Sequence, residues 1–464
     1  MQNNILTDCN AIILAAGKGT RMKSELPKVL HKVAGKPLVS HVIEACRAAG
    51  VEKPLLVVGH GSQQVRDAIG DDVAYCEQYQ QLGTGHAVMC ALPCIDLKKG
   101  ETFVMCGDAP LIEGETLREL HDYFKASGAV CTVLSATLSD PTGYGRIFRD
   151  GTGRVLGIIE EKDATENQKK ITEINTGTYC FDLAALRSVI NELDTHNAQG
   201  EYYLTQVLEL LIIKGCTVNA MKCRDNTAAL GVNDRIQQAQ AEKILRERTL
   251  RRAMREGATI IDPASTYIEA GVTIGADSVI RPNTHLRGET HIGSDCVIGP
   301  DCEIADSIIG DGSTVRYAVL DHAECGAKAN IGPYTYLRPG TRLAEGVKVG
   351  GFCEVKNSQV GKGSKIPHLS YIGDTDIGSG VNIGCGSITC NYDGYDKFRT
   401  QIGDNVFVGS NVSMVAPVHI APNSFIAAGS TVTQDVPEDA LAVARSRQSN
   451  IEGWAIKNRE KHQK

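Results

Sequence analysis

Residues 267–304 read YIEAGVTIGADSVIRPNTHLRGETHIGSDCVIGPDCEI, and every sixth residue from Ile268 to Ile304 is isoleucine or leucine. An α-helix repeats every 3.6 residues and a coiled coil every seven, whereas six residues suit one short strand followed by a bend. The position after the aliphatic residue is often glycine, which tolerates the backbone conformations of tight turns. The pattern therefore predicts a parallel β-helix, in which each coil buries its aliphatic residues only against neighbouring coils.

The six-residue spacing continues beyond Ile304, with breaks in register, as far as Val432. About 170 residues thus form one solenoid, and three hexapeptides to a coil give roughly nine or ten coils. The ends of such a prism need caps, and its flat faces can associate with other copies. The apolar positions after the first break are Cys325, Ile331, Leu337, Leu343, Val349, Val355, Val360, Ile366, Ile372, Ile402, Val408, Met414, Ile420, Ile426 and Val432.

The first part of the chain, about 230 residues long, has a different pattern. Short apolar runs alternate there with amphipathic stretches, which is typical of an α/β domain with a mostly parallel sheet. We therefore expect buried strands at the apolar runs and surface helices at the amphipathic stretches. The apolar runs include 11–14, 54–58, 102–105 and 129–134, and the amphipathic stretches include 37–49 and 115–125.

Residues 234–256 contain neither proline nor glycine and are predicted to form one helix, which Gly257 ends. We expect this helix to be an arm between two domains, with domain 1 at 1–232, the arm at 233–257 and domain 2 at 258–464. Its basic residues recur at helical spacing and predict a solvated face rather than a binding site. They are Arg235, Lys243, Arg246, Arg248, Arg251, Arg252 and Arg255.

The composition limits the class of protein. A chain of 464 residues with 42% hydrophobic content can form two or three domains with substantial cores. It lacks an apolar run of about 18 residues and the basic-then-apolar pattern of a signal peptide, so we expect a cytoplasmic protein without a membrane span. The 16 cysteines show no C-x-x-C pair or zinc spacing, which predicts free thiols. The net charge of -7 argues against binding to nucleic acid or to a membrane surface.

The first apolar run leads into a glycine-rich segment, LAAGKGTRM at 14–22, which is followed by Leu26-Pro27-Lys28. A glycine-rich turn after a strand lets backbone amides approach a triphosphate, and nearby cations offset the charge of the phosphates. The segment does not have the Walker A spacing, and Met22 stands where the dinucleotide fingerprint has its third glycine. It therefore predicts a nucleotide site of another kind.

This segment resembles the signature loop of the nucleotide-sugar pyrophosphorylases, in which a sugar 1-phosphate attacks the α-phosphate of a nucleoside triphosphate. Residues 103–108, FVMCGD, agree with the resemblance because they end a strand in an acid at the ligand-binding edge of the sheet. The resemblance implies that Asp108 and Asn233 hold Mg²⁺ as cofactor. It also implies that Arg21 and Lys28 steady the triphosphate and its transition state. Such a reaction needs positioning, charge neutralisation and a metal, but no base, because the attacking phosphate is already an anion.

The same resemblance implies the remaining contacts of the nucleotide sugar. One group of family positions contacts uracil, a second holds the amino sugar and a third contacts the nucleotide sugar elsewhere in the site. The corresponding residues are Gln78, Gly83 and Thr84 for uracil, Gly145, Glu160 and Asn175 for the amino sugar, and Leu14, Ala15, Ala16, Gly17, Lys28 and Asn233 for the rest of the site.

Four motifs interrupt the solenoid: LRPG at 337–340, EVK at 354–356, GKGSKIPHLSY at 361–371 and NIGCGSITCNYDG at 382–394. With the N-terminal motifs, they resemble one family over nearly the whole chain: the bifunctional enzymes of bacterial UDP-N-acetylglucosamine synthesis, in which a glucosamine-1-phosphate acetyltransferase is joined to an N-acetylglucosamine-1-phosphate uridylyltransferase. The resemblance implies an α/β, Rossmann-like nucleotidyltransferase domain, a long helix and a left-handed parallel β-helix. It also implies acetylation of glucosamine 1-phosphate by acetyl-CoA at the C-terminal site. The released N-acetylglucosamine 1-phosphate then reacts with UTP at the N-terminal site.

Acetyl transfer to an amine needs a group that removes a proton, and a histidine with a pKa near the working pH is a suitable general base. The resemblance gives this role to His368. It implies that Asn391 orients the amine and that the backbone amide of Cys385 faces the acetyl carbonyl, where it stabilises the developing oxyanion. The other implied contacts are Arg338 and Lys356 for the sugar phosphate, Tyr371 and Asn382 for the sugar, and Cys385, Asn391, Tyr392, Ser410, Ala428 and Arg445, with Trp454 as a further platform, for acetyl-CoA.

Two residues depart from the family pattern. Cys385 stands where the family usually has alanine, which keeps the backbone amide and adds an oxidisable sulfur. We expect activity to be retained with some thiol sensitivity, and loss of most activity in Cys385→Ala would contradict this. Gln206 replaces a usual aspartate, and the sequence assigns it no role.

The family assembles as trimers through its solenoids, with acetyl-transfer sites between subunits, so the resemblance implies a homotrimer. Two alternatives have distinct expectations. A pyrophosphorylase whose β-helix is structural or regulatory, as in the ADP-glucose enzymes, would lack the set of His368, Asn382 and Asn391. A non-catalytic assembly subunit, as in the translation exchange factor with the same two domains, would be expected to lose Lys28 or Asp108. All five residues are present.

Overall fold

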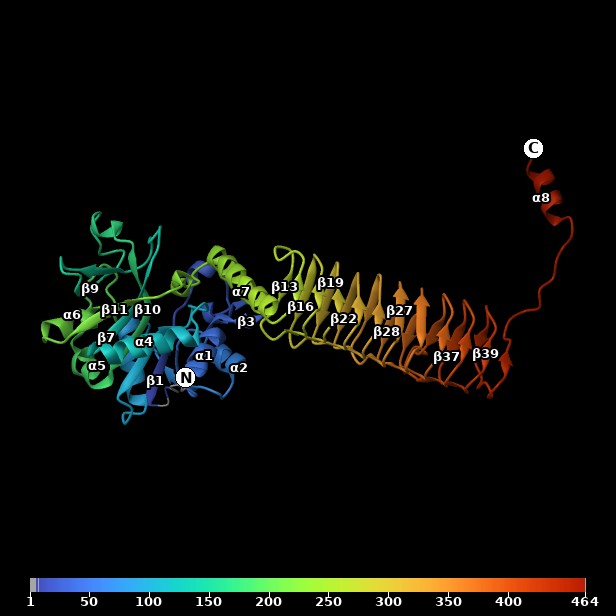
Figure 1. The fold of residues 1–464 in the computed structure, drawn as a ribbon, viewed down its shortest axis with the longest axis horizontal. Helices are drawn as coiled ribbons and strands as arrows, with labels where there is room; N and C mark the ends of the chain where they lie inside the picture. The colour runs from blue at the N-terminus through green and yellow to red at the C-terminus, as the bar shows by residue number, and fades with distance from the viewer. Residues whose placement is uncertain (1–5, 7, 464) are drawn as a thin grey trace. The chain divides into compact units, whose positions relative to one another are not determined.

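The structure is a computed structural model that describes Leu6 and residues 8–463. The chain folds into two compact units, which divide between Arg246 and Glu247. Figure 1 shows the first unit as helices packed on a sheet and the second as a stack of short strands followed by a C-terminal helix. Within the described residues, no helix is long and apolar enough to cross a bilayer.

The first unit is built on a sheet with the strand order β11-β7-β10-β6-β1-β4-β5. Neighbouring strands are parallel except that β10 runs antiparallel to both β6 and β7. This order confirms the mostly parallel sheet and the four strands that the apolar runs predicted. The strands are β1 (Cys9–Leu14), β4 (Leu55–Val58), β5 (Ala74–Glu77), β6 (Glu101–Cys106), β7 (Cys131–Thr137), β8 (Arg146–Arg149), β9 (Val155–Ile159), β10 (Glu173–Asp182) and β11 (Val218–Lys222), with a separate hairpin of β2 (Lys32–Val33) and β3 (Lys36–Pro37).

Helices cover both faces of this sheet because successive strand residues point to opposite sides. On β1, Ile13 packs into the core that includes α1, α2 and α4, whereas Ile12 packs into the core that includes α3, α5 and α6. Both amphipathic stretches form the predicted helices. The helices are α1 (Leu38–Ala49), α2 (Ser62–Ile69), α3 (Thr84–Ala91), α4 (Gly114–Ser127), α5 (Leu183–Val189) and α6 (Gln206–Ile213). A short 3₁₀ turn, Thr20–Met22, ends the glycine-rich segment, and a second, Lys28–Leu30, follows it.

Helix α7 spans Arg235–Arg255, which confirms the long helix expected between the two kinds of sequence. In its first half, the Glu242 carboxylate accepts a hydrogen bond from a backbone amide in the β2–β3 hairpin. In its second half, Leu250 is buried in the core of the second unit. Among the basic residues expected on a solvated face, Arg246 and Arg248 are half-buried and the others are exposed.

The second unit is a three-sided, left-handed parallel β-helix. Each strand pairs with the strand three places further along the chain, so three hexapeptides form one coil, as the spacing predicted. Ile268, Leu286 and Ile304 are paired on successive coils and are buried inside the prism. The register breaks where a repeat is one residue shorter, as between Ile304 and Ile309, or where residues 391–399 are inserted between two strands.

The three sides of the prism are named here faces 1, 2 and 3. The chain passes from face 1 to face 2 at corner 1–2 and from face 2 to face 3 at corner 2–3. Face 1 consists of β12 (Thr259–Ile260), β15 (Val279–Ile280), β18 (Val297–Ile298), β21 (Thr314–Val315), β24 (Asn330–Ile331), β27 (Lys348–Gly351), β30 (Lys365–His368), β33 (Asn382–Ile383), β36 (Phe407–Val408), β39 (Phe425–Ile426) and β41 (Leu441–Ala442). Face 2 consists of β13 (Tyr267–Ile268), β16 (Thr284–Arg287), β19 (Cys302–Ala305), β22 (Ala318–Asp321), β25 (Thr335–Leu337), β28 (Glu354–Lys356), β31 (Tyr371–Gly373), β34 (Ile388–Cys390), β37 (Ser413–Val415) and β40 (Thr431–Val432). Face 3 consists of β14 (Thr273–Ile274), β17 (His291–Ile292), β20 (Ile308–Ile309), β23 (Glu324–Cys325), β26 (Arg342–Leu343), β29 (Gln359–Val360), β32 (Thr375–Ile377), β35 (Thr400–Ile402) and β38 (Val418–Ile420).

Ile331→Ala tests whether stacking of the coils stabilises the second unit. Ile331 is fully buried and pairs with Val315 on one neighbouring coil and Val349 on the other. Its truncation removes contacts with both coils and leaves a cavity, so we expect a loss of about 2–5 kcal/mol. The urea midpoint of the β-helix transition, measured by circular dichroism, should fall. The exposed neighbour provides the control, Asn330→Ala, and equal midpoints for the two variants would contradict the stacking account.

Candidate functional sites

The first candidate site lies at the carboxyl ends of β1 and β6, the edge where α/β sheets bind ligands. The Gly107 amide donates a hydrogen bond to the Leu14 carbonyl at 2.9 Å, and the Ala15 amide donates to the Val57 carbonyl at 2.9 Å. These bonds hold the glycine-rich segment beside the strand end that leads to Asp108. The resulting cleft has a volume of about 520 Å³ and is lined by Leu14, Ala15, Ala16, Gly17, Lys18, Lys28, Val29, Gln78, Gln81, Gly83, Thr84, Ala87, Cys106, Asp108 and Glu201.

Lys28 connects the charged residues of this cleft. Its ammonium group donates to the Asp108 carboxylate and, at 3.0 Å, to the side-chain oxygen of Asn233. The Arg21 guanidinium donates to the same Asn233 oxygen at 2.9 Å. Gly19 has a φ of +60°, and a Cβ there would lie 2.5 Å from the Lys28 Cβ, so glycine permits this close approach. The structure thus brings together the four residues predicted for the phosphates and the metal.

The two oxygen donors predicted for Mg²⁺ fit a hard divalent cation. The Asp108 carboxylate and the Asn233 side-chain oxygen already face one cationic group, the Lys28 ammonium. The Val232 amide donates to the Asp108 carbonyl at 2.8 Å, which holds the Asn233 segment beside the acid. A carboxylate and an amide oxygen suit Mg²⁺, which keeps waters and substrate phosphates as its other ligands.

The residues expected to contact uracil lie together at one end of the cleft. The buried Gln78 side chain donates to the Gly83 carbonyl at 3.0 Å. Gly83 has a φ of +112°, and a Cβ there would lie 2.6 Å from the Tyr202 carbonyl oxygen, so this position requires glycine. The Thr84 hydroxyl accepts a hydrogen bond from a backbone amide in residues 201–204 at 3.1 Å. Residues 201–204 close this end of the cleft, and no motif in the sequence had assigned them a role.

The three residues predicted for the amino sugar also meet. The Asn175 backbone amide donates to the Gly145 carbonyl at 2.8 Å, and a Cβ on Gly145 would lie 3.4 Å from a Glu160 carboxylate oxygen. Burial raises the pKa of Glu160, and the Thr205 hydroxyl donates to its carboxylate at 3.0 Å. A carboxyl held in this way retains hydrogen-bonding capacity for a sugar hydroxyl.

Gln206, which sequence reasoning left without a role, holds the segment that precedes α6. Its side-chain amide donates to the Asp194 carboxylate at 3.1 Å, and its side-chain oxygen accepts from the Asp194 backbone amide at 3.1 Å. An ionised aspartate at this position could accept a hydrogen bond but could not donate one. The glutamine therefore makes a two-way contact that aspartate would lose.

The second candidate site is on the β-helix, where cationic side chains gather at face 2 and corner 2–3. Lys356 ends β28, and the neighbouring ammonium group of Lys397, from the inserted residues 391–399, lowers the pKa of Lys356. Arg338 follows β25 and forms an ion pair with Glu354 at 2.8 Å. Cations held this close together favour a bound anion such as a phosphate group, because its charge offsets their repulsion. Lys397 was missed from the sequence because the insertion carries no motif that places it beside Lys356.

Asn391 and Tyr371 border this group of cations. The Asn391 side-chain amide donates to the Asp374 carboxylate. A Cβ on Gly373 would lie 2.5 Å from the Tyr371 hydroxyl and 2.8 Å from the Asn391 side-chain nitrogen, so both polar groups approach the same glycine. Asp374 was also missed, because a single corner aspartate is common in such repeats.

His368 ends β30 and lies exposed on corner 1–2. Its carbonyl accepts a hydrogen bond from the Gly386 amide at 3.4 Å, which places Cys385 on the next coil of the same corner. The Gly429 amide then donates to the Ser410 carbonyl at 2.8 Å on the coils beyond. The coenzyme A residues that follow one another along this corner are Cys385, Ser410, Ala428 and Arg445.

Within one chain, the residues predicted for acetyl transfer fall into separate groups around the prism. Those for the sugar phosphate lie on face 2 and corner 2–3, whereas the predicted base and four coenzyme A residues, Cys385, Ser410, Ala428 and Arg445, lie on corner 1–2. Asn382 begins β33 on face 1, and Tyr392 is exposed on the insertion. Trp454 begins α8 (Trp454–His462) and is exposed. A substrate that contacts both the sugar-phosphate residues and the predicted base of one chain therefore has to extend across face 2.

Comparisons with known proteins give matches to both parts of the chain, the α/β unit and the β-helix. Residues 11–171 match the MobA-like NTP transferase domain, and residues 399–434 match the bacterial transferase hexapeptide (six repeats). Among curated relatives, the "Bifunctional protein GlmU" of Geobacillus sp. (strain WCH70) is 51% identical over 96% of this chain and 97% of its own. The protein of that name from Heliobacterium modesticaldum is 52% identical over 94% and 95%. The one from Halalkalibacterium halodurans is 49% identical over 96% and 98%.

Glu160→Gln tests the cost of burying this carboxyl group. Because its pKa is raised in the folded chain, its ionisation opposes folding at higher pH, and the penalty disappears as the pH falls below the unfolded value of about 4.3. We expect the variant to unfold at a higher temperature than the unchanged protein at about pH 8, and the difference to shrink toward about pH 4.

The exposed Glu166 provides the control, because Lys169 lowers its pKa and Glu166→Gln should change stability in the opposite direction. Thermal unfolding followed by circular dichroism at both pH values measures the two effects. The same pH dependence in both variants would contradict a buried, raised-pKa carboxyl at Glu160.

Proposed function

The chain belongs to the family of the bifunctional GlmU proteins, and we propose how its two units carry out the two reactions of that family. The protein is a bifunctional transferase that makes UDP-N-acetylglucosamine. One step transfers an acetyl group from acetyl-CoA to glucosamine 1-phosphate, and the next transfers uridylyl from UTP to N-acetylglucosamine 1-phosphate and releases pyrophosphate. Full-length similarity to bifunctional relatives is the observation that carries this conclusion. We place both steps in the cytoplasm, where UTP and acetyl-CoA are available.

For uridylyl transfer, the contacts of Lys28 support a site for the triphosphate. Its ammonium and the Arg21 guanidinium would neutralise charge on the phosphates and on the transition state. Asp108 and Asn233 would hold Mg²⁺, which would offset the negative charge of the phosphates. When substrate binds, Lys28 would exchange its bond with Asp108 for one with a phosphate oxygen.

The amino sugar would bind beside Gly145, Glu160 and Asn175, whose mutual contacts shape that part of the first unit. A phosphate oxygen of N-acetylglucosamine 1-phosphate forms a bond to the α-phosphorus of UTP, and the bond from that phosphorus to the leaving pyrophosphate breaks. The attacking oxygen is already anionic, so the protein supplies orientation and charge rather than a base. The cations Lys28 and Arg21, which both donate to the Asn233 side-chain oxygen, supply this charge.

For acetyl transfer, we place the phosphate of glucosamine 1-phosphate at the cations Arg338, Lys356 and Lys397. The Lys397 ammonium lowers the pKa of Lys356, which supports an anion at this position. Tyr371 would contact the sugar, and Asn391, oriented by its bond to the Asp374 carboxylate, would orient the amine. A planar guanidinium and two ammonium groups provide enough donors for the phosphate oxygens.

His368 would act as the general base at corner 1–2. Its imidazole accepts a proton from the amine as the amine nitrogen forms a bond to the thioester carbon. The Cys385 backbone amide would donate to the oxyanion that develops. The carbon–sulfur bond then breaks, and coenzyme A leaves as a thiol with the proton from the imidazolium. Ser410 and Ala428, on the following coils, would support the extended coenzyme along the same corner.

We also propose that the β-helix assembles as a trimer through an aromatic ladder on corner 1–2. Tyr317, Tyr334 and Phe352 lie on successive coils, with ring centroids 5.6 Å apart in the first, tilted pair and 5.1 Å apart in the second, stacked pair, and Leu369 follows on the next coil. All four have φ between 46° and 58°, a backbone conformation that is costly for bulky side chains. The ladder borders a hollow of about 510 Å³.

An exposed apolar ladder of this kind is typical of a protein interface. Phe352 is 63% exposed and Tyr334 is 58% exposed in the single chain. Because the ladder ends at Leu369, next to His368, a neighbouring subunit that covers it would also close the space beside the base. In a cyclic trimer, each of the three β-helices can bury its corner 1–2 against a neighbouring subunit, so no copy of this surface stays exposed.

Two variants should separate the two steps. His368→Ala should lose at least about 100-fold in acetyl transfer, because the general base is absent, and should retain uridylyl transfer from supplied N-acetylglucosamine 1-phosphate. Asp108→Asn should show the opposite pattern. Mass spectrometry of the sugars measures both reactions. Full acetylation by His368→Ala, or full uridylyl transfer by Asp108→Asn, would show that the corresponding assignment is wrong.

Phe352→Glu should dissociate the trimer, because it places charges where three copies of the aromatic ladder would meet. We expect the sedimentation velocity of a monomer, loss of acetyl transfer and retained uridylyl transfer. Phe425→Glu is the matched control, since Phe425 is an aromatic on face 1 that is also half-exposed, at 52%. A Phe352→Glu variant that sediments as the unchanged protein does would refute the ladder as the interface.

A further inference from the structure

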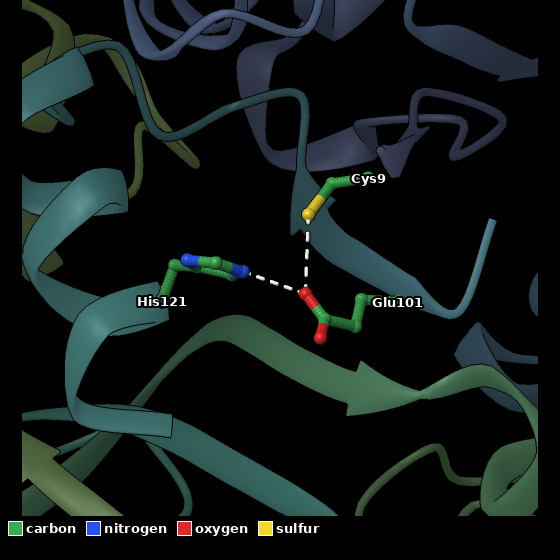
Figure 2. Close-up of side chains that lie close together, drawn as sticks. All are labelled: Cys9, Glu101 and His121. Atoms are coloured by element: carbon green, nitrogen blue, oxygen red, sulfur yellow. Dashed lines mark hydrogen bonds and ion pairs between the residues drawn. The ribbon is translucent and has the colours of Figure 1, made fainter. Parts of the chain in front are cut away.

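Three side chains that can bind metals meet at the amino ends of β1 and β6, on the sheet edge opposite the nucleotide cleft. Cys9 begins β1, Glu101 begins β6, and the two residues are paired in register. His121 comes from the middle of α4. Figure 2 shows the Cys9 thiol and the His121 ring directed at the same carboxylate oxygen of Glu101. The three ligand atoms all lie within 4.8 Å of one another.

The distances are close to those in the shell of a bound metal. Cys9 Sγ lies 3.5 Å from Glu101 Oε2, and His121 Nε2 lies 2.6 Å from the same oxygen. Around a tetrahedral Zn²⁺, sulfur and oxygen ligands are about 3.6 Å apart, and nitrogen and oxygen ligands about 3.4 Å. The sulfur and oxygen already have this spacing, so the imidazole would need to withdraw by only about 1 Å.

In this cluster, the protons of the Cys9 thiol and the His121 ring lie where a bound cation would contact Glu101. The Cys9 thiol and the His121 Nε2–H both donate to Glu101 Oε2. A bound ion would release the thiol proton to solvent and move the imidazole proton to Nδ1. That Nδ1 has no hydrogen-bond partner among the described residues, and it faces the Asp122 carboxylate 3.9 Å away. A carboxylate behind a ligating imidazole is a common arrangement in zinc sites.

The surroundings leave one carboxylate oxygen for an ion. Lys125 donates to Glu101 Oε1, which leaves Oε2 directed at the cluster. Cys9 is 2% exposed, and the side chains of Glu101 and His121 are 16% and 13% exposed, so solvent competes little with the three ligands.

We propose that Cys9, Glu101 and His121 bind a soft divalent cation of the Zn²⁺ class, with water as the fourth ligand. A thiolate and an imidazole favour such an ion over Mg²⁺, which prefers oxygen ligands. The ion is therefore distinct from the one proposed at Asp108. It would tie α4 to the first residues of two strands whose other ends border the nucleotide cleft.

Co²⁺ is the probe, because its bond to a thiolate gives charge-transfer absorption in the near ultraviolet. The full-length, reduced protein is titrated with Co²⁺ alone and compared with Cys9→Ala and with Cys46→Ala, a cysteine buried in the same core. We expect a band that saturates at one ion per chain in the unchanged protein and in Cys46→Ala, and that is missing from Cys9→Ala. Added Zn²⁺ should remove the band, and added Mg²⁺ should not.

His121→Gln is the second variant, because it leaves the buried thiol in place. It should keep thiolate absorption but weaken Co²⁺ binding at least about tenfold. Uridylyl transfer at the unchanged rate shows that each variant is folded, and if Cys9→Ala is not folded, His121→Gln decides the question. Titrations of the folded variants that superimpose on that of the unchanged protein would overturn the site, since the absorption would then come from other thiols.

Discussion

Each coil of the β-helix can bury its apolar residues only against the coils on either side of it. The pairing of each strand with the third strand further on turns this requirement into continuous columns, such as that of Ile268 and Leu286. The same pairing places residues far apart in the sequence on one corner, as with His368, Cys385 and Ser410. The geometry proposed for acetyl transfer therefore depends on unbroken stacking. In the first unit, the parallel register of β1 with β6 has the corresponding role for the nucleotide cleft.

The sequence was sufficient for those features that a local pattern encodes. The inward positions of the solenoid follow a fixed spacing, and four strands and two helices of the first unit, β1, β4, β6, β7, α1 and α4, follow from apolar periodicity. The outward corner positions could not be predicted in this way. Tyr317, Tyr334 and Phe352 are 17 or 18 residues apart, and their positive φ and mutual stacking arise only when the coils are in register.

The candidate sites likewise combine residues that a motif predicts with residues that only the folded chain brings together. Lys28, Asp108 and Asn233 belong to motifs, and the structure brings them into contact although they are far apart along the chain. Residues 201–204 and Lys397 are recognised only once the chain folds back on the cleft or on Lys356, because a single loop residue carries no periodic signal. Gln206 is similar: its two-way contact with Asp194 needs both partners in space. The cluster of Cys9 with Glu101 and His121 likewise depends on strand register and on a helix that covers the sheet.

The central proposal is that the two steps take place at separate sites, and that N-acetylglucosamine 1-phosphate released from the first site is the substrate of the second. The most direct test mixes His368→Ala with Asp108→Asn, supplies glucosamine 1-phosphate, acetyl-CoA and UTP, and follows UDP-N-acetylglucosamine by mass spectrometry. The account predicts that the mixture forms this product after a lag, with the free intermediate detectable, although neither variant forms it alone. A mixture that makes no product, while each variant performs its own remaining step, would contradict the account.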